Sequence, residues 1–300
     1  MSTIRSFLFV PGDSERKLAK AGTSPVDALI LDLEDSVAET RILIARQMVR
    51  EYLTAHRDRS RCKLWVRVNP IHGPKALHDL AAIMPGAPDG IMLPKPDSAA
   101  DAVLLDHYLT ALEVACGVAL GRTRILAVAT ETAASVFNLG SYQGATPRLA
   151  GLTWGAEDLS AALGASTNQD ASGELDLTYR LVRSLCLAGA VAAGVQPIDG
   201  VRPDFRDAKG LEQECLAARR AGFTGKIAIH PDQIEGINLG YSPDPDEVAH
   251  ATAVVAAFER AGGAGAVQLE GKMLDKPHLT QALRVLASAG ASAAAATAST

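Results

Sequence analysis

At 300 residues, of which 48% are hydrophobic, the chain is long enough to bury a large core, either as one α/β barrel or as two ordinary domains. The formal net charge of −5 and the lack of any run of Lys and Arg exclude the basic footprint of a nucleic-acid-binding protein and a polybasic membrane surface. Scattered cysteines without a C-x-x-C pair, and an N-terminus whose only apolar run is FLFV, predict a reduced cytoplasmic protein with no membrane span.

Short apolar segments rich in β-formers alternate along the chain with amphipathic or Ala-rich segments. They occupy residues 7–12, 28–35, 63–70, 90–96, 124–132, 149–158, 195–204 and 225–231. Continuous apolar strands separated by helices are typical of a parallel sheet covered on both faces. Eight such repeats within roughly 240 residues match the size of a (β/α)₈ barrel. We therefore predict an α/β protein with a (β/α)₈ TIM barrel, with a doubly wound open sheet as the alternative.

The segments that follow the eighth repeat predict a C-terminal appendage. A long helix, PDEVAHATAVVAAFERAG, is followed by a strand-turn-helix segment and then by the monotonous sequence ASAAAATAST. The predicted division is a catalytic barrel over 1–262, an appendage over 263–290 that packs on a neighbouring subunit, and a disordered tail over 291–300.

Polar side chains stand at the end of every predicted strand, where TIM barrels place their catalytic residues. Any one of them could be an ordinary turn residue or salt-bridge partner. Because the strand bodies carry almost no charge, their coincidence at one rim predicts a ligand site there. In chain order they are Asp13, Asp32, Glu34, Asp35, Arg67, Asn69, Lys95, Glu131, Glu157, Asp158, Asp199, Arg202 and His230.

Glu131 and Asp158 are the most informative pair at this rim, because they end consecutive strands. Neighbouring strands lie ~4.8 Å apart, so the two carboxylates can reach one cation. A hard ion held by two carboxylates, waters and ligand oxygens is typical of Mg²⁺. Glu157 and Asp158 could alternatively cap the helix that they begin. We expect Asp158 to bind the metal and Glu157 to cap the helix or support the site.

Three basic side chains at the rim each allow two interpretations. Arg67 lies in a strand that is otherwise apolar, so it needs an anionic partner, either a substrate carboxylate or enolate or the acids Asp32, Glu34 and Asp35. Lys95 is either a Schiff-base lysine or a salt-bridge partner of the same acids. His230 is either a general base or a hydrogen-bonded rim residue.

Eight ordered motifs make the chain resemble a known family. They are RSFLFVPGD, DALILDLEDSV, LWVRVNP, GIMLPK, WGAEDLSAALG, IDGVRPDFRD, GFTGKIAIHPDQI and EGKMLDKPHL, and the resemblance they carry extends over about residues 4 to 287. This pattern resembles the citrate lyase beta-subunit-like CoA-ester lyases of the HpcH/HpaI aldolase superfamily. The sequence departs from the family pattern in ATETAAS, LPKPD and EGKM, which leaves the acyl substrate open.

The resemblance implies a TIM barrel that forms a homotrimer or a dimer of trimers. It implies Mg²⁺ held by Glu131 and Asp158, and catalysis by Arg67 together with Asp275, which would enter the active site of a neighbouring subunit. Lys95, Asp32 and Asp35 complete the expected substrate-binding set, with Arg67 and Glu131. The implied substrates are CoA thioesters or 2-oxo acids.

The expected reaction is cleavage or formation of the C–C bond of malyl-, citramalyl- or citryl-CoA, which relates a short acyl-CoA to a 2-oxo acid. Mg²⁺ would polarise the hydroxy acid, Arg67 would stabilise the enolate, and Asp275, or less plausibly His230, would protonate it. Other members hydrolyse the thioester, as a malyl-CoA thioesterase does, or act as a non-autonomous citrate lyase beta subunit. A Schiff-base aldolase that uses Lys95 is a further alternative.

Overall fold

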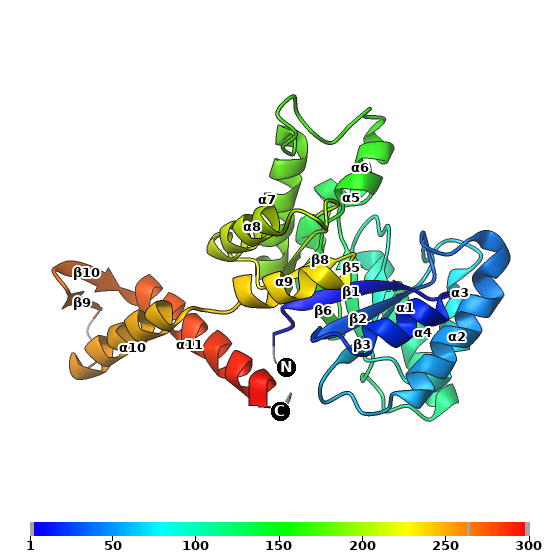
Figure 1. Cartoon of the computed structure of the whole chain (residues 1–300), viewed down its shortest axis with the longest axis horizontal. Coiled ribbons are helices and arrows are strands. Elements are labelled where there is room, and N and C mark those ends of the chain that lie inside the picture. The colour runs from blue at the N-terminus through cyan, green and yellow to red at the C-terminus, as the bar shows by residue number, and fades with distance from the viewer. Residues whose placement is uncertain (1–2, 263–264, 298–300) are drawn as a thin grey trace. The chain divides into compact units, whose positions relative to one another are not determined.

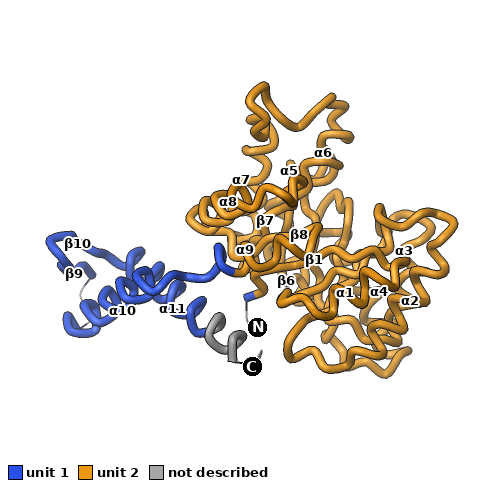
Figure 2. The backbone as a smooth tube through the Cα atoms, viewed as in Figure 1, with its two compact units in different colours: residues 1–3, 239–300 blue, residues 4–238 orange. Residues whose placement is uncertain are grey.

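The computed structural model describes residues 3–262 and 265–297, with residues 291–297 described by their backbone alone. The contacts within the chain divide it into two compact units (Figure 2). One unit comprises residues 4–238, and the other comprises residues 1–3 and 239–300. The predicted disordered tail, 291–300, falls on these backbone-only residues and on 298–300, which lie outside the described residues.

Eight parallel strands form a closed barrel in sequence order (Figure 1). Closure comes from the pairing of β1 with β8, in which Phe7 is the register partner of Ile227. This pairing confirms the predicted TIM barrel and excludes the doubly wound open sheet, whose edge strands would stay unpaired. The strands are β1 (Ser6–Pro11), β2 (Ala28–Asp32), β3 (Lys63–Arg67), β4 (Gly90–Leu93), β5 (Arg124–Val128), β6 (Leu149–Thr153), β7 (Gln196–Asp199) and β8 (Gly225–Ala228).

Helices connect successive strands, and local sequence sets several of their ends. Helix α4 begins after Ser98, whose hydroxyl accepts the amide N–H of Ala100, and ends at Gly117, whose φ of +67° places it in the left-handed region. None of the described helices has the length and apolar character needed to cross a membrane. The helices of the barrel unit are α1 (Glu15–Ala21), α2 (Ile42–Ala55), α3 (Ala76–Ile83), α4 (Ala99–Cys116), α5 (Ala133–Phe137), α6 (Ala156–Leu163), α7 (Leu177–Ala192) and α8 (Ala208–Ala221), with α9 (Ile234–Gly240) at its end.

The barrel interior is a packed apolar core. Phe7 and Trp65 meet edge to face with ring centroids 6.1 Å apart. Side chains from the other strands pack around this pair and fill the interior, as is usual in TIM barrels. Because the interior is filled, ligands can enter only at an end of the barrel. The buried residues of this cluster are Phe7, Ala28, Ile30, Trp65, Met92, Leu126, Val128, Ile198 and Ile227.

The C-terminal unit has a small core of its own. Helix α10 (Pro245–Arg260) packs with α11 (Lys276–Thr297), and an antiparallel hairpin, β9 (Ala266–Leu269) with β10 (Lys272–Asp275), stands between them in the chain. Val254, Phe258 and Leu274 are buried together in this core. The boundary between the two units lies after residue 238, so α10 belongs to the C-terminal unit. The division predicted from the sequence has its boundary at residue 262, which includes α10 in the barrel domain.

Candidate active site

A cavity of about 750 Å³ opens at the C-terminal ends of the barrel strands. Its floor consists of apolar side chains that also belong to the barrel core, including Met92, Val128 and Ile227. Ionisable side chains also line this cavity. They are Arg16, Lys17, Lys20, Asp32, Asp35, Arg67, Glu131, Glu157, Asp158 and His230.

Arg67 lies on the cavity wall as a partner of the acids that follow β2. Asp32 and Arg67 are register partners on adjacent strands, and the carboxylate of Asp32 accepts hydrogen bonds from both Nε and Nη2 of Arg67 at 2.7 Å. Nη1 of Arg67 lies 2.9 Å from Oε2 of Glu34. Arg67 therefore forms the internal ion pair that the sequence allowed as its second interpretation. Arg67 also lines the cavity.

Asp32 organises the loop that carries Glu34 and Asp35. Its Oδ1 accepts the amide N–H of Glu34 at 3.0 Å, and its Oδ2 accepts that of Ser36 at 3.2 Å. Burial alone would raise the pKa of Asp32, but the hydrogen bonds and charge of Arg67 outweigh it and hold this pKa below its ordinary value. Asp32 is therefore a fixed carboxylate that aligns Arg67.

Glu131 is a buried carboxylate just beyond the end of β5, and only 5% of the residue is exposed. Its Oε2 accepts the backbone N–H of Lys95 at 2.7 Å, and the described residues give it no ion pair. Burial, with the nearby charges of Asp158 and Glu34 adding to it, raises the pKa of Glu131 to about 8. A cation beside Glu131 would stabilise its charged form.

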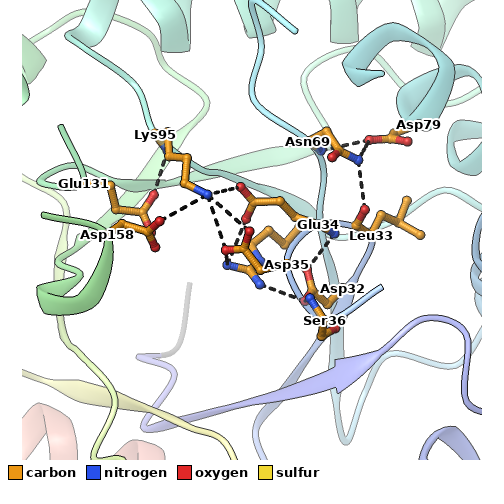
Figure 3. Close-up of polar contacts among 11 residues, drawn as sticks. Asp32, Leu33, Glu34, Asp35, Ser36, Asn69, Asp79, Lys95, Glu131 and Asp158 are labelled. Carbon is orange, nitrogen blue, oxygen red and sulfur yellow. Dashed lines mark hydrogen bonds and ion pairs between the residues drawn. The ribbon is translucent and has the colours of Figure 1, made fainter. Parts of the chain in front are cut away.

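Asp158 lies in the first turn of α6, and Figure 3 shows it beside Glu131. Gly155, which precedes α6, leaves room for the carboxyl of Glu131. A Cβ at this position would stand 3.2 Å from Oε1 of Glu131, which is closer than most Cβ contacts. The helix has no side-chain cap, so the helix cap is excluded of the two roles expected for Glu157, and its support of the site stays a prediction. Glu157 instead accepts a hydrogen bond from Asn168 at 2.8 Å.

Lys95 connects the two groups of acids (Figure 3). Its ammonium lies 2.7 Å from Oε1 of Glu34 and 3.2 Å from Oδ1 of Asp158. Burial alone would lower the pKa of Lys95, but the hydrogen bond and charge of Glu34 and the charge of Asp158 raise it above the ordinary value. A Schiff base requires the neutral amine, so the geometry favours the salt-bridge interpretation of Lys95.

The residues at this wall fit a hard divalent cation. Glu131 and Asp158 offer carboxyl oxygens side by side, and the buried Glu131 has no ion-pair partner among the described residues, so a bound cation would favour its charged form. No set of three or more His, Cys, Asp and Glu residues suited to a metal occurs among the described residues. A cation held here would take its remaining ligands from water and substrate, as Mg²⁺ commonly does.

Three cations of α1 line the cavity and were missed from the sequence. Arg16, Lys17 and Lys20 are all exposed. The signal was available in the segment SERKLAK, which follows the first strand and so belongs to the active-site end of the barrel. These residues lie in the helix after the strand and not at the strand end itself. They give the cavity a cationic side that suits an anionic ligand.

Six of the predicted rim residues do not line the cavity: Glu34 and Lys95 belong to the ion-pair cluster of Arg67 beside it, and four others lie apart from it. Asp13 pairs with Arg41, and the side chain of Asn69 donates to Asp79 and to the carbonyl of Leu33. Arg202 pairs with Asp207 and Glu214. Each of these three residues follows the end of its strand by two or three positions, and its partner lies in or next to a helical segment of the barrel unit.

Asp199 is the fourth of these residues, and it is fully buried among its partners. It accepts hydrogen bonds from Arg183, Lys226 and Nε1 of Trp154. Burial alone would raise the pKa of Asp199, but the charges of Lys226 and Arg183 hold it well below its ordinary value. Trp154 lines the cavity, so Asp199 supports the wall from behind.

His230 is a rim residue held by its surroundings. Its ring stacks on Phe205 with centroids 4.4 Å apart, and its Nδ1 accepts the amide N–H of Asp232 at 3.3 Å. Nε2 is therefore the ring nitrogen left for a ligand. This arrangement favours the hydrogen-bonded interpretation of His230 over that of a general base.

Asp275 lies in the C-terminal unit, at the end of β10. Its Oδ1 is 2.6 Å from Nδ1 of His278 in the first turn of α11, and its side chain is half exposed. Its predicted entry into a neighbouring active site stays a prediction.

Comparison with known proteins identifies relatives over nearly the whole chain. Residues 5–231 match the family model described as HpcH/HpaI aldolase/citrate lyase. A (3S)-malyl-CoA thioesterase of Cereibacter sphaeroides is 37% identical over 97% of this chain and 96% of its own length. The citrate lyase subunit beta of Escherichia coli is 36% identical over 96% of this chain and 93% of its own. Protein CitE of Mycobacterium tuberculosis, solved with magnesium, acetoacetate and coenzyme A, has a TM-score of 0.79 and 35% identity over 96% of this chain and 99% of its own.

Proposed function

This chain belongs to the HpcH/HpaI aldolase/citrate lyase family, and we propose that it is a Mg²⁺-dependent CoA-ester lyase. Its substrate is a 3-hydroxyacyl-CoA of the malyl-, citramalyl- or citryl-CoA type. The reaction relates this thioester to a short acyl-CoA and a 2-oxo acid. Magnesium and coenzyme A in the related CitE structure support this assignment of cofactor and substrate class.

The observation that carries the proposal is the distribution of charge around one cavity. Glu131 and Asp158 supply metal-binding oxygens on one wall, whereas Arg16, Lys17 and Lys20 supply cations from α1. A CoA ester has matching chemistry, since its acyl end binds oxygen-liganded metals and its other end carries phosphates. Under this assignment the α1 cations contact the phosphates and the acyl group lies near Glu131.

In the lyase direction, the substrate hydroxyl gives its proton to water and becomes the carbonyl of the 2-oxo acid. The electron pair of the broken C–C bond becomes the enolate of the departing thioester, which then takes a proton on carbon. Bound Mg²⁺ supplies Lewis-acid polarisation of the oxygens of the hydroxy acid. Arg67, held rigid by Asp32 and Glu34, donates hydrogen bonds to the developing negative oxygen. The apolar floor at Met92, Val128 and Ile227 keeps water from the enolate.

Asp275 is the proposed proton donor, supplied by a neighbouring subunit of a homotrimer or a dimer of trimers. The family resemblance supports this role, and the position of Asp275 outside the barrel unit is consistent with action across a subunit boundary. The half-exposed side chain leaves the carboxyl accessible to a partner.

A thioesterase on the same scaffold is the second candidate, and the Cereibacter sphaeroides relative favours it. Both reactions use one thioester but release different products. Incubation with malyl-, citramalyl- and citryl-CoA in the presence of Mg²⁺ separates them, with free thiol and 2-oxo acid measured in parallel. We expect 2-oxo acid without free thiol. Thiol release without a 2-oxo acid would assign a thioesterase, and failure to turn over any free thioester would favour the non-autonomous beta subunit.

Removal of the metal or its ligands tests the metal assignment. Chelation by EDTA should abolish turnover, and Mg²⁺ should restore it. Glu131→Ala and Asp158→Ala should each lower kcat by about 10²- to 10³-fold, because each deletes a ligand oxygen and raising the substrate concentration cannot replace it. Glu212→Ala, which removes an exposed acid from α8, is the control and should keep wild-type kcat. Turnover that survives chelation would contradict the metal assignment.

A further inference from the structure

Lys95 adopts a backbone conformation that is rare for its residue type. Its φ of +50° lies in the left-handed region, which favours glycine. Pro96 follows directly, and a residue before proline is biased toward extended conformations. Such a conformation persists when the surroundings hold it, so the contacts of Lys95 indicate what the strained backbone accomplishes.

In this conformation the amide N–H of Lys95 points to Glu131. The nitrogen lies 2.7 Å from Oε2, and this is a hydrogen bond to a carboxylate that is almost fully buried. Rotation about φ turns the side chain of Lys95 relative to its own N–H, so the left-handed φ lets one residue hold the N–H on Glu131 and the ammonium near Asp158 at once. The backbone N–H thereby fixes the orientation of one proposed metal ligand.

The side chain of Lys95 reaches the other proposed ligand. Its Nζ is 3.2 Å from Oδ1 of Asp158, and also lies 2.7 Å from Glu34 and 3.3 Å from Asp35 (Figure 3). Glu34 is also paired with Arg67, whereas Asp158 has no second ion pair in the part of the chain that the structure describes. The ammonium is thus the one positive charge paired with Asp158.

We propose that Lys95 is a positioning residue for the metal site, with separate roles for its backbone and its side chain. The backbone N–H orients Glu131 for the cation. The ammonium compensates Asp158 while the metal is absent, and it gives up this contact, but not Glu34, when the dication binds. This inference rests on the proposed function, because it takes Glu131 and Asp158 as metal ligands.

The two roles predict opposite changes in metal affinity, which substitutions at one position can separate. Lys95→Gly removes the competing ammonium and adopts positive φ without strain, so the N–H stays on Glu131. Lys95→Ala removes the same ammonium, but its Cβ makes the left-handed conformation unfavourable, and the ion pairs that held Lys95 in this conformation are gone. Lys95→Arg keeps the charge. Lys209→Met, which removes an exposed charge from α8, controls for net charge.

The experiment is a titration of each full-length variant with Mn²⁺ alone, with free Mn²⁺ measured by electron paramagnetic resonance. Lys95→Gly should bind Mn²⁺ about tenfold more tightly than the wild type, because a charge close to the ion has been removed. Lys95→Ala should bind more weakly than Lys95→Gly, while Lys95→Arg and Lys209→Met should stay near the wild type. In EDTA, Lys95→Gly should also unfold at a lower temperature than the wild type, since Asp158 loses its counter-charge.

Unchanged or weaker Mn²⁺ binding by a folded Lys95→Gly variant would overturn the role of the ammonium. Equal affinities of Lys95→Ala and Lys95→Gly would overturn the role of the backbone. In both cases the wild type still binds Mn²⁺, so the proposed function stands. A wild type that binds no Mn²⁺ would overturn this inference and the metal assignment together.

Discussion

The side chain of Arg67 both pairs with buried acids and lines the cavity. Three of its nitrogens contact Asp32 or Glu34, and its guanidinium stacks over Phe9 at 4.6 Å from the ring centroid. The sequence predicts that this arginine needs an anion, because the rest of its strand is apolar. The partner could not be chosen from the sequence, since the choice depends on the register that sets Asp32 beside Arg67.

Replacement of Arg67 tests how much the buried acids depend on it. Arg67→Met leaves Asp32 and Glu34 in the barrel end without the guanidinium, and breaking a buried ion pair costs about 3–5 kcal/mol. We expect the free energy of unfolding in urea to fall by this amount and activity to be lost. Arg57→Met, which removes an exposed arginine, should change this free energy by less than about 0.5 kcal/mol. An Arg67→Met protein as stable as the wild type would show that other groups compensate the two acids.

At the scale of strands and helices, the repeat pattern predicted the barrel correctly, but it could not assign the side chains at the strand ends. Asp32 and Asp199 both end buried strands, yet Asp32 lines the cavity and Asp199 does not. If a strand ends one residue earlier or later, its last side chain faces the helices instead of the cavity, or the reverse. The α1 cations were missed because a helix turn, rather than a strand end, carries them to the cavity.

The opposite end of the barrel carries a buried ion-pair network that joins α4 to the start of β6. Both carboxylate oxygens of Glu113 accept hydrogen bonds from Arg148, and they also accept the amide N–H groups of Gly121 and Thr123. Arg148 pairs in addition with Asp106 on the same helix. In TIM barrels, polar groups at this end serve stability rather than catalysis.

This network predicts an acid-dependent loss of stability. Burial alone would raise the pKa of Glu113, but Arg148 and the two amide donors hold it below the ordinary value of 4.5. A carboxyl with a lowered folded-state pKa contributes stability above its unfolded pKa and loses it as the pH falls through the folded one. The free energy of unfolding should therefore decrease as the pH falls below about 4.5.

Urea unfolding of the wild type and of Glu113→Gln, measured between about pH 7 and pH 2, checks this expectation. At neutral pH, Glu113→Gln should be about 3–5 kcal/mol less stable than the wild type, and the difference should narrow as the pH falls. Glu51→Gln, an exposed change on α2, should follow the wild-type curve. Parallel pH profiles of the wild type and Glu113→Gln would mean that Glu113 does not carry the acid dependence.

At the scale of the whole molecule, the sequence predicted an element beyond the barrel but not how it is built. The structure gives a hairpin, β9 with β10, and two helices around a separate core in which Phe258 and Leu274 are buried. This core forms between segments close in sequence, so α10 groups with the hairpin rather than with the barrel. The proposed entry of Asp275 into a neighbouring subunit depends on contacts between chains, which one chain does not contain.

Mixed oligomers can test whether Asp275 completes the active site of a neighbour. Asp275→Asn and Glu131→Ala should each be inactive alone, because one lacks the proton donor and the other a metal ligand. Subunits of the two variants, denatured together and refolded, should regain activity, since a Glu131 from one chain can then meet an Asp275 from the next. In a cyclic oligomer with random mixing, about a quarter of the sites are intact. Each variant refolded alone is the control, and a mixture as inactive as these controls would mean that Asp275 acts within its own chain.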